Sequence, residues 1–178
     1  MMHSVTGAEH PRAGPRVEAR ARGEHLAGFI YGTIVALSVV VAGAKAYPDS
    51  PGRVAVLVTI TTGVLWLAHV YSFSLGHSVT SNEHLSFDEV RRIAGREASI
   101  IRAAVPPVAV LLLGAVGVLG AVTAFWAALG AGLVVLAGQG ILFARIERLG
   151  VAATIVVVAV NVGLGVVLIG LKVLVGHL

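Results

Sequence analysis

The chain has 178 residues, of which 57% are hydrophobic and only 12% are charged, and its mean hydropathy is +0.91. Soluble domains average about 45–50% apolar and about 25% charged residues, so a water-soluble globule is excluded because too little polar surface is present to cover it. The net charge is +4, and the basic residues lie at predicted helix ends, which argues against a nucleic-acid partner. The absence of cysteine excludes disulfides and thiolate metal sites.

We therefore expect an all-α protein: a polytopic transmembrane helical bundle with five spans and one basic amphipathic surface helix. Residues 1–25 combine arginines, prolines and glycines without apolar periodicity, which predicts a disordered cytoplasmic tail before a single transmembrane domain over 26–178. The expected spans are 26–46, 54–77, 103–121, 124–145 and 150–175, and the expected surface helix is 86–101.

The first span ends in Ala44-Lys45-Ala46, which resembles a signal-peptidase site. Its apolar run over 26–46 is longer than the ~7–15 residues of a signal-peptide core, so we expect the helix to be retained. Gly28 and Gly32 form a small-xxx-small pair, which predicts a helix-packing surface. The turn formers in 47–52 then reverse the chain.

The second span has two different faces. Polar and aromatic side chains lie within an arc of about 80°, at Thr59, Thr62, Trp66, His69, Phe73 and His77. The opposite face is apolar, with Ile60, Val64, Leu67, Tyr71 and Leu75. An ionisable group is costly against lipid, so we expect the polar face to meet the bundle interior or a water-filled cavity. His69 is its leading candidate, because imidazole titrates near neutral pH.

The surface helix is predicted from a start signal and from its charge. Ser86 and Glu89 have the spacing of a capping box, with Ser86 as N-cap. Four arginines then alternate with apolar residues, at Arg91, Arg92, Arg96 and Arg102. This basic amphipathic pattern favours a helix at the membrane surface, and a solvated partner-binding helix is the alternative.

No charged residue occurs from Ala103 to Ala144. One helix of that length would extend roughly 60 Å, about twice the hydrocarbon core, so we expect a hairpin of two spans. Its turn is predicted at 120–123, with Thr123 as the next N-cap and Trp126 as an interface anchor. Pro106-Pro107 would then lie in the first turns of the third span, where proline costs least.

Charge bias predicts the orientation. If the tail is cytoplasmic, ten lysines and arginines lie inside and three, namely Lys45, Arg53 and Lys172, lie outside. This strong positive-inside bias predicts a bacterial-type inner (plasma) membrane protein with its N-terminus in the cytoplasm and its C-terminus outside. In the last span one stripe carries Thr154, Asn161, Gly165, Leu168 and Lys172.

On this orientation Tyr31, His69 and Gln139 lie at a similar depth, roughly 8–12 Å from the inner boundary, with Asn161 nearer mid-membrane. The candidate pore or polar-layer residues are Tyr31, Thr62, Trp66, His69, Gln139 and Asn161. Together they would form a proton relay or an ion-coordinating constriction. The alternative is that they form hydrogen bonds that hold the helices together.

Catalytic chemistry is not predicted. The chain has no metalloprotease, nucleophile-elbow or phosphate-loop motif, and no acidic residue lies inside a span, which argues against a carboxylate-driven pump. His77, Glu83, His84 and Asp88 match no standard ligand spacing. We therefore expect no enzyme, no cofactor and no metal.

Two local patterns resemble a known family. Glu24-x-Leu26-x-x-Phe29-x-x-Gly32, with Lys45 ending the same helix, and Trp66-x-x-His69 on the next resemble the first two helices of the bacterial relatives of the lysosomal potassium channel. Those proteins are six-span tetramers whose first helix lines the pore, so the resemblance implies a small cation channel. The family's Phe-Ser-Asp-Gly signature differs here, since Ile30-Tyr31 occupies its middle pair.

The sequence thus predicts an integral membrane protein that acts as a small oligomeric cation or proton channel or transporter-like conduit. The alternative is a non-enzymatic structural or accessory subunit of a membrane complex. The expected partners are the lipid bilayer, further copies of the chain in a homo-oligomer, or another membrane protein. Glycine-rich helix faces favour such association.

Overall fold

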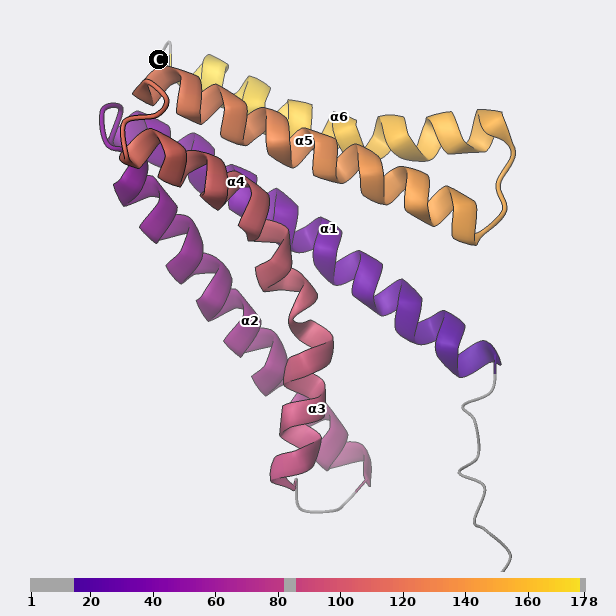
Figure 1. Cartoon of the computed structure of the whole chain (residues 1–178). Helices are drawn as coiled ribbons and strands as arrows, with labels where there is room; N and C mark the ends of the chain where they lie inside the picture. Colours follow the sequence, from indigo (N-terminus) through magenta and orange to yellow (C-terminus); the bar gives the residue numbers. More distant parts are fainter. Residues whose placement is uncertain (1–14, 82–85, 177–178) are drawn as a thin grey trace, which may run out of the picture.

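The computed structural model describes residues 15–81 and 86–176, with side chains from 26 to 76, from 86 to 167 and at 169 and 170. These ranges contain six helices and no strand, which confirms the all-α class (Figure 1). They are α1 (Pro15–Ala46), α2 (Pro51–Ser81), α3 (Phe87–Glu97), α4 (Ser99–Ala115), α5 (Ala121–Ile146) and α6 (Val151–Gly176). The predictions for residues 1–14, for Glu83 and His84, and for the side chains of His77, Leu168 and Lys172 lie outside the described part.

Three helices are long and apolar enough to cross a membrane: α1 over Leu26–Ala46, α2 over Pro51–Gly76, and α5. The 17 residues of α4 extend only about 26 Å, and α4 qualifies together with α3, from which it is bent by 42°. The apolar segment described in α6, Val151–Val167, is shorter than these three helices and is not counted among them. By length and composition, the described residues therefore contain three helices that could cross a membrane, or four if α3 and α4 cross as one, compared with the five spans predicted.

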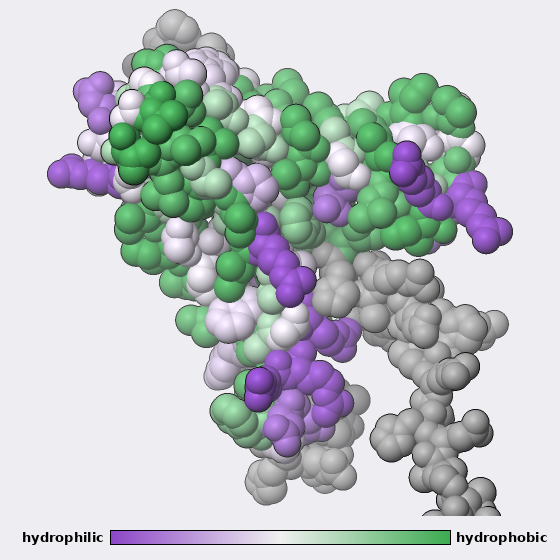
Figure 2. All heavy atoms as spheres, viewed as in Figure 1, coloured by the Kyte–Doolittle hydropathy of each residue, from purple (hydrophilic) through white to green (hydrophobic). Residues whose placement is uncertain are grey.

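The helices converge at one end and diverge at the other (Figure 1). The α1–α2 and α4–α5 turns meet at the convergent end, whereas α3 and the α5–α6 turn point apart at the divergent end. Figure 2 shows hydrophobic side chains over most of the visible face and hydrophilic ones gathered at these extremities. The apolar core occupies the helix halves that converge, and includes Leu37, Val40, Val54, Val58, Leu111, Phe125 and Leu129.

Glycines set the closest helix contacts. A Cβ atom on Gly32 would lie 2.7 Å from the carbonyl oxygen of Ile100 and 2.9 Å from its Cα, and one on Gly28 would lie 2.8 Å from Ser99 Oγ. The predicted small-xxx-small pair therefore packs α1 directly on the backbone of α4. Gly132 of α5 likewise gives room to Leu37 of α1.

The start of α3 confirms the predicted capping box. Glu89 N donates to Ser86 Oγ at 3.3 Å, and Ser86 N donates to Glu89 Oε2 at 3.1 Å. The helix breaks at Ala98, so α4 begins at Ser99 and not at Ala103. α3 packs mainly on α2, and lies beside its end in Figure 1.

Two local predictions about the hairpin were wrong. Pro106 and Pro107 lie inside α4 and not in its first turns, because the residues after Ala98 join the helix before them. Without N–H groups these prolines leave the carbonyls of the residues four positions earlier without their helical donors. The N-cap of α5 is Gly120, not Thr123, because Gly117 at φ 81° completes the turn sooner.

The first helix also differs from the prediction. α1 begins at Pro15, and not at Leu26, so residues predicted as tail are helical in backbone. Proline suits the first position of a helix, and the segment that follows is rich in alanine, arginine and glutamate, which are strong helix formers. Helix propensity therefore extends α1 beyond its apolar part.

Gly32→Ala should destabilise the protein by about 1–3 kcal/mol, because the added methyl group meets the α4 backbone, which cannot move aside easily. Gly63→Ala on α2 is the matched control, since a Cβ there has no atom within 4 Å. It should be neutral or stabilise by about 0.5–1 kcal/mol. Thermal unfolding of the detergent-solubilised variants measures both, and equal melting temperatures would contradict the α1–α4 packing.

Candidate functional site

The α2 helix turns one face inward and one outward. Its buried side chains include Val54, Val58, Thr62, Val70 and Ser74, which are four or eight residues apart, and also Ala55. Every residue of the predicted apolar face is exposed, namely Ile60, Val64, Leu67, Tyr71 and Leu75. Of the predicted polar face, Thr62 is buried, Trp66 and His69 are partly buried, and Thr59 and Phe73 are exposed. The polar residues in the middle of α2 therefore contact the other helices.

Tyr31 of α1 and His69 of α2 lie side by side, with ring centroids 5.6 Å apart and planes tilted by 44°. Tyr31 is 46% exposed, so this pair lies at the surface of the bundle and not in its core. His69 Nδ1 is 3.1 Å from the carbonyl oxygen of Leu65. Because that oxygen can only accept, the contact is a hydrogen bond in the tautomer whose hydrogen is on Nδ1, and in that tautomer Nε2 is an acceptor.

Trp66 connects α2 to α3. Its Nε1–H donates to the carbonyl oxygen of Ala94 at 3.0 Å, in the last turn of α3 before the break at Ala98. A buried or lipid-facing N–H without an acceptor is costly, so this bond holds α3 against α2 and helps to fix the bend into α4. The structure thus gives Trp66 an interhelical hydrogen bond, which is the role that the alternative interpretation of the polar candidates describes.

The hydroxyl groups bond within their own helices. Thr33 Oγ1 donates to Phe29 O at 2.9 Å, and Thr62 Oγ1 donates to Val58 O at 2.7 Å. Ser38 and Thr59 bond in the same way to the carbonyl four residues earlier. These groups therefore do not present free donors to a path between helices. Ser74 Oγ is buried with no hydrogen-bond partner among the described residues.

The remaining polar candidates belong to the α5–α6 pair. Asn161 of α6 is buried beside Gly140 of α5, where its Nδ2 lies 3.1 Å from the position that a Cβ would take. Gly165 on the same stripe packs on Leu133 and Leu136. Gln139 of α5 is partly buried. Figure 1 shows this pair diverging from α1 and α2, so the six candidates fall into two groups on different helix pairs.

Within the described residues, no three His, Asp or Glu side chains come close enough to hold a metal ion. Asp88 is exposed in the first turn of α3. Its three proposed companions, His77, Glu83 and His84, lie outside the residues whose side chains are described.

The long apolar helices define the class as an all-α protein suited to a membrane, with its charged residues near helix ends. In comparisons with protein-family models, curated proteins and solved structures, no match to this chain was found.

Trp66→Phe should cost about 0.5–1.5 kcal/mol, the usual net value of one hydrogen bond, and should loosen α3 while keeping the ring packed. Hydrogen exchange of the α3 amides in detergent would measure this as reduced protection over 87–97. Tyr71→Phe, which removes a polar group from the exposed face of α2, is the control. Unchanged exchange in the Trp66 variant would contradict the anchoring role.

Proposed function

We propose that the protein is a small oligomeric membrane protein that conducts protons or cations along a path lined by His69 and Tyr31. The observation that supports this most is the exposed contact between an imidazole and a phenol on two membrane-type helices. Ionisable groups within spans are costly against lipid and mark ion or proton pathways when they face water. His69 Nε2 and the Tyr31 hydroxyl can both accept and release a proton.

The path lies between copies of the chain and not within one bundle. The convergent half of the bundle is filled by apolar side chains, and the hydroxyls near it are engaged by their own helices. Tyr31, in contrast, faces outward beside His69. A second copy packed on α1 and α2 would cover this pair and remove it from lipid.

We also propose five spans, with α3 at the inner surface and α4 and α6 crossing the membrane. The chain contains no cysteine, so single substitutions can report the side of each turn. Asp49→Cys should react with an impermeant reagent from outside and Glu147→Cys only from inside, because three crossings separate them. Labelling of intact cells and of inverted vesicles measures this, and labelling of both sites from one side would refute the topology.

The conducting role is tested by flux into liposomes that contain the purified protein. His69→Ala should reduce proton flux on the order of tenfold or more, as the loss of a proton-transferring group does elsewhere. Tyr31→Phe, which keeps the ring but removes the hydroxyl, should reduce it less, and Tyr71→Phe on the exposed face should leave it unchanged. The proposal fails if the protein passes neither protons nor alkali cations.

A structural or accessory subunit is the second candidate. It is favoured by Trp66, whose hydrogen bond joins α2 to α3, and by the hydroxyls, which are bonded within their own helices and leave no free donor for a path. On this alternative, further copies or another membrane protein cover the exposed helix faces without forming a path. Co-purification of one partner in fixed stoichiometry, together with the absence of flux, would select it.

A further inference from the structure

A groove follows the exposed side of α1 and α2 near the convergent end of the bundle. It consists of two adjoining hollows of about 480 Å³ and about 370 Å³, and Leu57 lines both. The first begins at the α1–α2 turn, beside Tyr47 and Arg53. The second continues along α1 from Ala46 to Val35. The groove therefore runs from the end of the two helices toward their middle.

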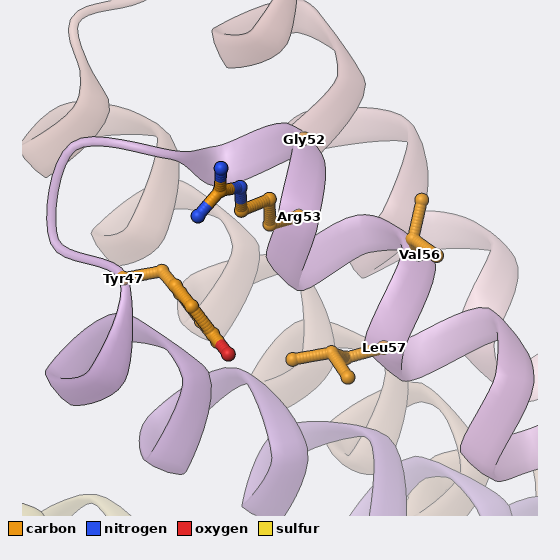
Figure 3. A pocket seen from close by; sticks show the side chains of 5 residues that line it. All are labelled: Tyr47, Gly52, Arg53, Val56 and Leu57. Carbon is orange, nitrogen blue, oxygen red and sulfur yellow. The ribbon is translucent and has the colours of Figure 1, made fainter.

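The turn end of the groove is cationic. Arg53 extends over the ring of Tyr47, with its guanidinium carbon 5.7 Å from the ring centroid (Figure 3). Two cations, Lys45 and Arg53, and one carboxylate, Asp49, lie at this end. The first turn of α2 also lies here; the N–H groups of Arg53 and Val54 are bonded to Ser50 O, so only the positive end of the helix dipole favours an anion. An anionic group fits this end of the groove better than a cationic one.

The rest of the groove is mostly apolar, with Ser38 and Thr61 as its polar lining residues. Val35, Val39 and Leu57 line it, and the small residues Ala42 and Ala46 make room between them. The Ser38 hydroxyl, which also lines the groove, is already bonded to Ile34 O at 2.8 Å and does not require a polar partner. From Ala46 to Val35 the helix rises roughly 16 Å, close to half of the ~30 Å hydrocarbon core. This length suits one acyl chain within one leaflet.

We propose that the groove binds an anionic phospholipid, with the lipid phosphate at Arg53 and one acyl chain along α1 and α2 as far as Val35. The inference needs only that α1 and α2 lie in a membrane, and it holds whether or not the protein conducts ions. The cationic end and the apolar groove, which is about as long as one leaflet is thick, together favour a lipid over a second polypeptide. The cation–π contact holds the guanidinium at the mouth of the groove.

Native mass spectrometry of the full-length protein in detergent, titrated with phosphatidylglycerol or with phosphatidylcholine of the same acyl chains, tests the proposal. Phosphatidylglycerol should bind more tightly. Arg53→Gln should weaken its binding about fivefold, the contribution of one basic residue near an anionic headgroup. Arg145→Gln, which removes the same charge at the divergent end, should have no effect.

Bulk placed in the groove tests the acyl-chain part. Ala42→Phe and, independently, Ala46→Phe should weaken binding of both lipids, because each exposed alanine lines the groove. Val160→Phe on the exposed face of α6 is the control. Two variants are used because a folding defect in either one would also reduce lipid binding. The melting temperature of each variant is therefore measured beside its lipid binding.

Three results would overturn the proposal. Equal binding of the two lipids, unaffected by Arg53→Gln, would remove the headgroup role. Full competition by inorganic phosphate would indicate a site for free anions. A change in oligomer mass in the Ala42 and Ala46 variants, without any change in lipid binding, would show that a second copy of the chain occupies the groove.

Discussion

The close contact of α1 with α4 is the interaction on which the rest of the arrangement depends. In lipid the hydrophobic effect does not draw helices together, so association relies on packing that small residues permit. Gly32 lets α1 approach the backbone of α4 at Ile100, and α4 in turn contacts α1, α2 and α5. The helix that carries Pro106 and Pro107 is thereby the centre of the bundle, although its 17 residues extend only about 26 Å.

The same central helix determines where the polar residues lie. Because α4 continues from α3 through a 42° bend, α3 is brought beside the second half of α2, and Ala94 near the end of α3 accepts the indole hydrogen of Trp66 in the middle of α2. His69, one turn along α2, is left facing α1 and Tyr31. Trp66 and His69, which the sequence places on one polar face, thus have different surroundings: Trp66 joins two helices, and His69 lies beside Tyr31 at the surface of the bundle.

The divergence of the helices gives the two ends different properties. The convergent end holds the apolar core, the turn with Arg53 and the groove, whereas the divergent end carries α3 with its arginines and the α5–α6 turn. Exposed apolar side chains on α2, α5 and α6 cover the outer faces, as lipid contact requires. Lipid in the groove and a further copy over Tyr31 and His69 would occupy different parts of the α1–α2 surface, so the two proposals are compatible.

Much of the secondary structure follows from the sequence alone. Composition determined the helical, membrane-suited class, period-3.6 patterning identified the outward face of α2, and local chemistry specified the Ser86–Glu89 capping box and the Gly28–Gly32 packing surface. These features depend on residues within a few turns of one another. Periodicity gives the direction of a side chain around its own helix, but it does not identify the helix opposite.

Tertiary structure decided the features that depend on which helices lie next to one another. The acceptor for Trp66, the separation of Asn161 from His69, and the groove beside Arg53 each require the positions of two or three helices. The error at Pro106-Pro107 has a related cause, since the bend at Ala98 shifts the start of α4 and hence the place of its prolines. Local signals determine that a helix forms, whereas contacts between helices decide where it begins and what it faces.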